Sequence, residues 1–327
     1  MIEALATYES GSFDPFLNLA MEQHLLETVA SGCCLLYLWQ NENTVVIGKN
    51  QNPWAECRAS LLEEEGGHLA RRLSGGGAVF HDLGNLNFTF LVPTEDYDLA
   101  KQQRVLLEAC RSFGIPAELS GRNDLTADGR KFSGNAFYHN GPRSYHHGTL
   151  LVDVDGAKLQ RYLTPTKAKL EAKGVPSVRS RVVNLKELCP TITVETLKKA
   201  LINAFESVYG LKSAPRVLTE ADTARIAQLR ETYASWDWRF GQRLPFTCRA
   251  EGRFTWGGVE TQLDVDRGTI RAARVYTDAM DHDLAARVEA ALLGCAFQRE
   301  TLFQALAASG LAQDVQDDLT SLFDTLF

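Results

Sequence analysis

Two kinds of apolar periodicity alternate along this chain, and their order limits the folds that it can adopt. Stripes with the spacing of amphipathic helices stand between short strand-like runs. The helical stripes cover residues 13–29, 99–113, 193–209 and 218–234, and the strand-like runs cover 35–39, 44–48, 86–92 and 149–154. Because these segments lack the regular spacing of β-α-β units, we predict an α+β fold rather than a doubly wound sheet.

The pattern changes after about residue 243, where strand-like runs are followed by helical stripes. The runs lie at 254–256, 259–265 and 269–276, with Asp266-Arg267-Gly268 as a tight turn, and the stripes lie at 283–293, 299–308 and 314–327. A chain of 327 residues is also longer than one hydrophobic core usually serves. We therefore predict a large domain of residues 1–243 and a small α+β domain of residues 244–327, with Gly241–Pro245 as the boundary.

Charge and cysteine content argue against several classes of protein. The net charge of -7 disfavours nucleic acid as a partner. The seven cysteines, without a C-x-x-C pair, disfavour a disulfide framework or a zinc site. The N-terminal residues do not resemble a signal peptide, and no stretch approaches the roughly eighteen apolar residues of a membrane span. We expect a cytoplasmic protein that does not bind a membrane.

The densest motif surrounds the glycine triplet Gly75-Gly76-Gly77, which follows Arg71-Arg72-Leu73-Ser74 and precedes Ala78-Val79-Phe80-His81-Asp82. Consecutive glycines let backbone amides approach an anion closely, and arginines bind phosphate or carboxylate. The spacing is not that of a Walker A loop, because no Gly-Lys-Ser/Thr follows. A structural turn is the alternative, but the apolar residues after the triplet indicate a loop held between packed strands.

A second motif combines Asn123-Asp124 with Lys131 and Ser133-Gly134. A lysine beside a Ser-Gly turn can place a positive charge next to a phosphate. Asparagine and aspartate can bind Mg2+ together with substrate phosphates, so Asp124 is a candidate metal ligand. The alternatives are an ordinary surface lysine and an Asx-turn.

Two further segments leave their role open. Residues 158–186 contain eight basic residues against one acid, Glu171. They form either a solvated loop or a loop that closes over a phosphorylated ligand or docks an acidic protein.

His146 and His147 are adjacent, so in a strand they point to opposite faces and cannot easily hold one metal ion. One histidine lining a pocket is the better interpretation.

At these motifs the sequence resembles the bacterial lipoate–protein ligase A family. The matching blocks are Arg71 to Asn85, Asn123 to Ala136 and His146 to Leu151, with further similarity at residues 14–20, 51–54, 173–182 and 253–260. The resemblance covers nearly the whole chain. It implies a biotin/lipoate protein ligase-like catalytic domain followed by a small α+β C-terminal accessory domain.

Members of that family activate lipoate with ATP and Mg2+ as lipoyl-AMP, release pyrophosphate, and pass the lipoyl group to a lysine of a carrier protein. The resemblance therefore implies a lipoate–protein ligase that uses ATP, Mg2+ and (R)-lipoate. Its partners would be lipoyl domains of 2-oxoacid dehydrogenase complexes and the glycine-cleavage carrier protein. We expect the enzyme to be a monomer.

The resemblance, together with the motifs above, also assigns roles to particular residues, with Lys131 as the catalytic residue. The ATP-binding residues would be Arg72, Gly77, Ala78, Val79, Phe80, Asn123, Asp124 and Lys131. The lipoate-binding residues would be Arg72, Ser74, His81, Lys131, Gly134, Ala136 and His147. A loop that orders over the adenylate would include Lys173, Gly174, Arg179 and Arg181. Asn135 lies at a position that varies in the family, so it does not weaken the resemblance.

Three other functions fit less well. An ATP-independent octanoyl or lipoyl transferase would hold the acyl group on a thiol, but Cys57, Cys110 and Cys189 stand in no nucleophile motif. A biotin ligase would need a Gly-Arg-Gly-Arg loop, which the sequence lacks. A non-catalytic lipoate sensor would have lost its charged groups, yet Arg72, Asp124 and Lys131 are all present. The residues therefore favour the ligase.

Overall fold

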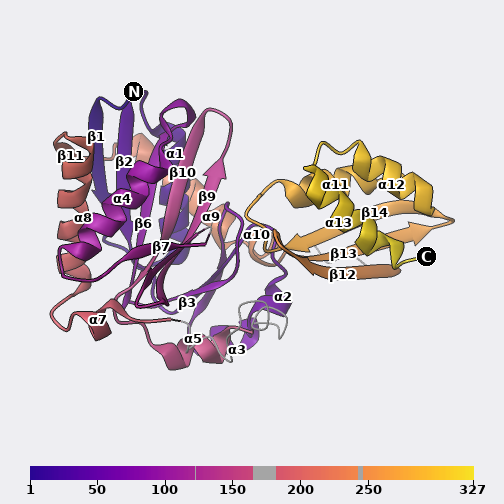
Figure 1. Ribbon diagram of the computed structural model, residues 1–327, viewed down its shortest axis with the longest axis horizontal. Helices are drawn as coiled ribbons and strands as arrows, with labels where there is room; N and C mark the ends of the chain where they lie inside the picture. The colour runs from indigo at the N-terminus through magenta and orange to yellow at the C-terminus, as the bar shows by residue number, and fades with distance from the viewer. Residues whose placement is uncertain (122, 165–181, 242–245) are drawn as a thin grey trace. The chain divides into compact units, whose positions relative to one another are not determined.

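The computed structural model of the protein describes residues 1–121, 123–164, 182–241 and 246–327 (Figure 1). The chain forms two compact units. The larger unit contains residues 1–46, 57–71 and 79–239, and the smaller unit contains residues 47–56, 72–78 and 240–327. The glycine triplet therefore belongs to the same compact unit as the C-terminal residues.

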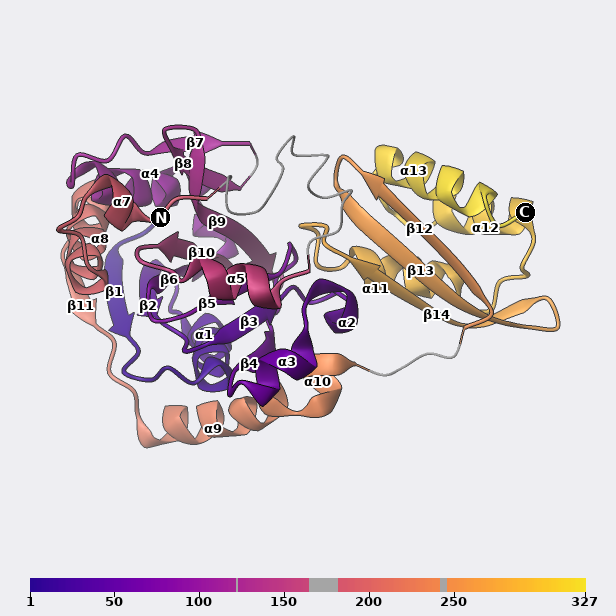
Figure 2. The same ribbon diagram turned by 90° about the horizontal axis from the view of Figure 1, so that it is seen from below.

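A mixed eight-stranded sheet forms the centre of the large unit (Figures 1 and 2). Its strands, in spatial order, are β11 (Ser213–Pro215), β1 (Ala4–Glu9), β2 (Cys33–Trp39), β6 (Asn85–Pro93), β10 (Arg143–Leu151), β9 (Arg130–His139), β8 (Asp124–Ala127) and β7 (Glu118–Ser120). β1 is parallel to β11 and β2, and all other neighbours are antiparallel. The predicted α+β class is confirmed.

Helices cover both faces of this sheet. α4 (Leu99–Arg111) and α8 (Val194–Tyr209) lie side by side over one face, where they pack against the apolar side chains of β6 (Figures 1 and 2). α1 (Pro15–Thr28) contacts β6 and β10, and α9 (Glu220–Ala234) packs against α1. Because β6 is covered on both sides, all of its residues are buried, including the polar Thr89.

A second, three-stranded sheet contains β4 (His68–Arg71), β3 (Thr44–Ile47) and β5 (Val79–His81) in that order. The sequence predicts strands at 35–39 and 44–48 joined by a polar turn, but the corresponding β2 and β3 belong to different sheets. β3 pairs on both edges and is fully buried, which explains its continuous apolar run. The glycine triplet lies between β4 and β5, so the predicted loop between packed strands is confirmed.

The small unit contains the antiparallel strands β12 (Cys248–Phe254), β13 (Gly257–Asp266) and β14 (Thr269–Thr277), followed by α11 (Leu284–Leu292), α12 (Arg299–Ala307) and α13 (Gln313–Asp324) (Figure 1). Burial alternates along β13, because the helices cover one face of the sheet. Arg267 and Gly268 join β13 to β14 with φ angles of 51° and 72°, as in a type I′ turn. The predicted turn and helices are confirmed. The first strand was wrongly placed, since Thr255–Trp256 form a turn after β12.

Helix ends follow the sequence closely, whereas strand ends do not. Thr193 Oγ1 caps α8 by accepting from Thr196 N at 3.1 Å, and Gly210 ends that helix with a φ of 71°. β10 begins at Arg143, whereas the sequence predicted a start at residue 149. The prediction was late because the polar first half of β10 hides the strand pattern.

The shorter elements that connect these helices and strands are α2 (Pro53–Glu56), α3 (Ala59–Glu64), a 3-10 turn (Thr94–Asp96), α5 (Gly156–Tyr162), α7 (Leu185–Leu188) and α10 (Trp236–Phe240). No helix in the described ranges is long and apolar enough to cross a membrane.

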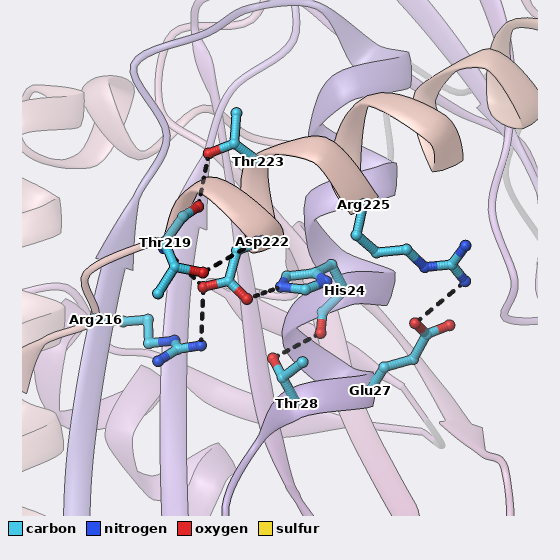
Figure 3. Close-up of polar contacts among 8 residues, drawn as sticks. All are labelled: His24, Glu27, Thr28, Arg216, Thr219, Asp222, Thr223 and Arg225. Atoms are coloured by element: carbon cyan, nitrogen blue, oxygen red, sulfur yellow. Dashed lines mark hydrogen bonds and ion pairs between the residues drawn. The ribbon is translucent and has the colours of Figure 1, made fainter.

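A histidine–aspartate contact fixes α9 to α1 (Figure 3). His24 Nε2 on α1 lies 2.8 Å from Asp222 Oδ1 in the first turn of α9. Thr219 N donates to Asp222 Oδ2 at 2.8 Å, and Asp222 N donates to Thr219 Oγ1 at 3.1 Å. These contacts lower the pKa of Asp222 to about 2, with the Thr219 amide as the main cause. Asp222 therefore both caps its own helix and joins that helix to α1.

Asp222→Ala should lower the free energy of unfolding at pH 7 by about 1–2 kcal/mol, because α9 loses a cap and its partner on α1. The folded pKa of about 2 lies below the ordinary value of 3.8, so this stabilisation is present above pH 3.8 and lost as the pH falls through about 2. Urea unfolding should therefore separate the variant from wild type at pH 7 and bring them together near pH 2. Glu220→Ala, an exposed acid in the same turn, is the control. Equal urea midpoints at pH 7 would contradict this role of Asp222.

Candidate active site

Lys131 and Asp124 form an ion pair across neighbouring strands of the large unit. Lys131 Nζ lies 2.6 Å from Asp124 Oδ1, and the two side chains are 22% and 17% exposed. Lys131 is the second residue of β9, and Asp124 is the first residue of β8. The pair thus holds a partly accessible positive charge at a fixed position, as binding of an anionic substrate requires.

A tight hairpin sets the position of Lys131. Asp128 and Gly129 join β8 to β9 with φ angles of 51° and 72°, as in a type I′ turn. A β-bulge follows, because Leu125 pairs with Ser133 whereas Thr126 pairs with Lys131. Our sequence prediction missed this hairpin. The Asp-Gly pair was the signal that could have revealed it.

Gly134 leaves the space that the Lys131 side chain occupies. A Cβ atom at position 134 would lie 2.7 Å from Lys131 Nζ and 3.0 Å from Lys131 Cε. Two residues further along β9, Ala136 pairs with His147 of β10. The structure therefore brings Lys131 and three predicted lipoate-binding residues together on two adjacent strands.

Buried polar groups connect His147 to Trp39. His147 Nδ1 lies 2.8 Å from Glu22 Oε1, and Thr89 Oγ1 donates to the same oxygen at 2.7 Å. Trp39 Nε1 donates to Thr89 Oγ1 at 3.1 Å. A carboxylate oxygen only accepts, so His147 Nδ1 is the donor to Glu22. Sequence analysis missed Glu22, because a glutamate that is only 2% exposed is rare; its place within the apolar stripe of α1 was the available signal.

His81, the second histidine predicted to bind lipoate, is buried against Trp39. The ring centroids of His81 and Trp39 are 6.1 Å apart in an edge contact. His81 Nδ1 lies 3.2 Å from Asn41 Nδ2. Phe80, the residue before His81 in β5, is buried against Tyr162, with ring centroids 5.6 Å apart. Both histidines thus belong to one network of contacts that includes the Trp39 indole.

Within the small unit, Arg72 holds the glycine loop. Arg72 Nη2 donates to the carbonyl oxygens of Gly75 and Gly77 at 2.7 and 2.8 Å. Arg72 Nε donates to Ser74 Oγ at 3.0 Å, and both side chains are buried. Four of the predicted site residues, Arg72, Ser74, Gly77 and Ala78, therefore lie in this one segment.

The first two glycines of the triplet pack against the C-terminal part of the same unit. Gly76 has a φ of 87°, and its amide donates to Ala279 O at 3.0 Å. A Cβ atom on Gly75 would lie 2.3 Å from Ala279 O. A Cβ atom on Gly77 would meet no described atom within 4 Å. Close backbone packing thus requires Gly75 and Gly76, while Gly77 borders open space.

Asn123 and Asp124 offer oxygen atoms of the kind that Mg2+ prefers. An ion at Asp124 would share the carboxylate with Lys131 and take its other ligands from phosphates and water, which is a common arrangement for magnesium. Among the described residues, no group of three or more His, Cys, Asp or Glu side chains is arranged to hold a metal. The donor set therefore fits a magnesium ion that arrives with a nucleotide.

The predicted adenylate-loop residues Lys173, Gly174, Arg179 and Arg181 lie outside the described residues. The chain is described again from Val182, which forms a parallel bridge with Lys131. Val183 N donates to Lys131 O at 2.9 Å. The residues that follow the predicted loop are thus fixed beside the proposed catalytic lysine.

Comparison with known proteins identifies the family. A sequence model described as "Lipoyl protein ligase A/B catalytic domain" matches residues 14–206. A second, described as "Bacterial lipoate protein ligase C-terminus", matches residues 244–322.

Solved structures of similar fold agree. LipL1 of P. falciparum, solved in complex with lipoate, has a TM-score of 0.85 and 28% identity over 97% of this chain and 98% of its own. Lipoate-protein ligase A bound with ATP has a TM-score of 0.64 and 25% identity over 74% of this chain and 99% of its own. The bipartite ligase of Thermoplasma acidophilum has a TM-score of 0.65 and 25% identity over 76% of this chain and 100% of its own. The chain therefore belongs to the lipoyl protein ligase A/B family and carries the C-terminal region of the bacterial lipoate protein ligases.

Proposed function

We propose that this protein is an ATP-dependent lipoate–protein ligase. It converts lipoate and ATP into lipoyl-AMP and pyrophosphate, and then transfers the lipoyl group to a lysine of an acceptor protein. The Lys131–Asp124 pair carries the proposal, because it holds the Lys131 ammonium beside the predicted lipoate-binding residue Gly134. Two further predicted lipoate-binding residues follow nearby, since Ala136 lies on the same strand and pairs with His147. The relatives that bind lipoate and ATP support the two substrates.

The first step must bring two anions together. A lipoate carboxylate oxygen attacks the α-phosphorus of ATP, and the bond to the departing pyrophosphate breaks. Two negative charges at 4 Å repel by about 4 kcal/mol at an effective dielectric constant of 20. Lys131 offsets this repulsion by binding the lipoate carboxylate and the phosphate at once. A magnesium ion at Asp124 would neutralise further phosphate charge.

The second step needs no nucleophile from the enzyme. The acceptor lysine amine attacks the lipoyl carbonyl carbon, an amide bond forms, and AMP leaves as the departing group. We propose nucleotide contacts for Arg72, Gly77 and Ala78 and lipoate contacts for Arg72 and Ser74, as the resemblance implies. Catalysis in both steps would then depend on positioning and electrostatic stabilisation rather than on covalent chemistry.

The buried network around His147 suits the apolar part of lipoate. Glu22 accepts hydrogen bonds from His147 and Thr89 inside the protein, so its carboxylate can lie next to an acyl chain without losing its partners. Trp39 and His81, whose rings meet in an edge contact, would provide further contacts for the acyl chain. A mostly apolar pocket with a few fixed polar groups is typical of small-molecule sites.

We propose lipoyl domains of 2-oxoacid dehydrogenase complexes and the glycine-cleavage carrier protein as acceptors. The T. acidophilum ligase was studied with its E2 lipoyl domain, which supports this class of partner. We also propose that the protein acts as a monomer in the cytoplasm. A thiol-dependent transferase is less consistent with Cys110, because burial raises the pKa of its thiol to about 12.

The proposal is tested by incubating the protein with lipoate, Mg-ATP and a purified lipoyl domain, followed by intact mass spectrometry. The acceptor should gain one lipoyl group only when ATP is present, with AMP formed in equal amount. Transfer from an octanoyl carrier protein without ATP would instead identify a transferase. An unmodified acceptor and no AMP would rule out the ligase.

A further inference from the structure

His146 lies among aromatic side chains, on the opposite face of β10 from His147. Its ring centroid is 5.3 Å from that of Phe88, 5.2 Å from that of Phe137 and 5.9 Å from that of Phe90. The side chain is fully buried, and this desolvation lowers its pKa to about 3, with a smaller effect from His147. His146 is therefore neutral at physiological pH and carries one ring proton.

The partner of His146 is Asn135 on the neighbouring strand β9. His146 Nε2 lies 2.8 Å from Asn135 Oδ1. Asn135 Nδ2 donates to Asn123 O at 2.9 Å, so Asn135 Oδ1 is the acceptor and His146 Nε2 carries the proton. His146 Nδ1 has no hydrogen-bond partner among the described atoms, which agrees with this tautomer.

Asn135 in turn holds the residue that precedes β8. Asn123 O accepts from Asn135 N at 2.8 Å as well as from the side-chain amide, and Asn123 Nδ2 donates to Asn135 O at 2.9 Å. These bonds extend the β8–β9 pairing by one residue beyond Asp124 and Gly134. Without them Asp124 would stand at the fraying end of its strand.

We propose that His146 and Asn135 are positioning residues for the Lys131–Asp124 pair. The buried ring orients the Asn135 amide, the amide fixes Asn123, and Asn123 places Asp124 where it meets Lys131. The proposal rests on the proposed function for the chemical role of Lys131. The geometry of the pair can, however, be measured without enzyme turnover.

The test compares Asn135→Ala, His146→Phe and the double variant with Ser144→Ala. Phenylalanine fits the aromatic cluster but cannot donate to Asn135. Ser144 is the matched control, because it is also fully buried on β10 and hydrogen-bonds His139 Nδ1 at 2.7 Å rather than Asn135. Removal of the Ser144 hydroxyl should change the stability of the protein about as much as the other substitutions do, while leaving β8 in place.

Two readouts distinguish positioning from a purely structural role. The first is the rate at which acetic anhydride labels Lys131, measured by peptide mass spectrometry with the exposed Lys186 as internal reference. The second is the kcat and KM of lipoate-dependent pyrophosphate release.

Asn135→Ala should raise the relative labelling rate of Lys131 by about threefold, the size expected when a partly exposed ion pair is loosened. It should lower kcat by about tenfold, with a smaller change in KM, because the lysine is misplaced for the chemical step. His146→Phe should act in the same direction, and the double variant should match Asn135→Ala, since one residue acts through the other.

Labelling rates and kcat values equal to those of Ser144→Ala would overturn the proposal, as would additive effects in the double variant. If the wild-type protein released no pyrophosphate, the proposed function would fail. The labelling of Lys131 would still decide whether His146 and Asn135 position the pair.

Discussion

Lys131→Ala should reduce lipoate-dependent pyrophosphate release by at least about 100-fold, because the group that offsets the repulsion between carboxylate and phosphate is removed. The protein should remain folded, since a partly exposed ion pair contributes only about 0–1 kcal/mol to stability. Pyrophosphate release measured with saturating substrates, together with thermal unfolding, checks both statements.

Lys186→Ala is the matched control for this experiment. Lys186 also pairs with an aspartate, Asp153, but both side chains are about half exposed, at 48% and 56%. Its loss should leave the rate unchanged. A rate for Lys131→Ala close to that of this control would remove Lys131 from the mechanism.

Gly134→Ala should lower kcat by about 10- to 100-fold without unfolding the protein. The added Cβ would lie 2.7 Å from Lys131 Nζ, so the lysine must leave its position beside Asp124. The displaced atoms are the far end of a flexible side chain, so the cost in stability is small. Steady-state kinetics and thermal unfolding of the variant measure the two effects separately.

Gly11→Ala provides the comparison, because Gly11 is exposed and a Cβ there would meet no described atom within 4 Å. Both variants add one methyl group to a glycine, but only one of them displaces Lys131. Wild-type kcat for Gly134→Ala would show that the lysine can act from another position.

Local signals in the sequence predicted much of the fold. The Thr193 cap and the Gly210 stop fixed both ends of α8, because those interactions lie within a few residues of each other. The Arg267-Gly268 turn was predicted for the same reason. β9 was missed because Ser133, Gly134 and Asn135 interrupt its apolar pattern between the buried Phe132 and Ala136.

The sequence predicted residues of the candidate site only where a suitable residue type also matched a motif of the family. Lys131 and Asp124 stand in one motif, and the structure joins them across a hairpin. Glu22 and Ala279 were missed, because their contacts with His147 and Gly76 connect residues more than one hundred positions apart. Such contacts follow from the packing of whole elements, which local patterns do not encode.

The central claim is that the lipoyl carboxylate is activated at Lys131. A crystal structure of the protein with a non-hydrolysable lipoyl-adenylate analogue tests it most directly. We predict that either the lipoyl carbonyl oxygen or an oxygen of the adjacent phosphate lies about 3 Å from Lys131 Nζ. The acyl chain should extend toward His147. An analogue bound at another surface, with no contact to Lys131, would contradict the account.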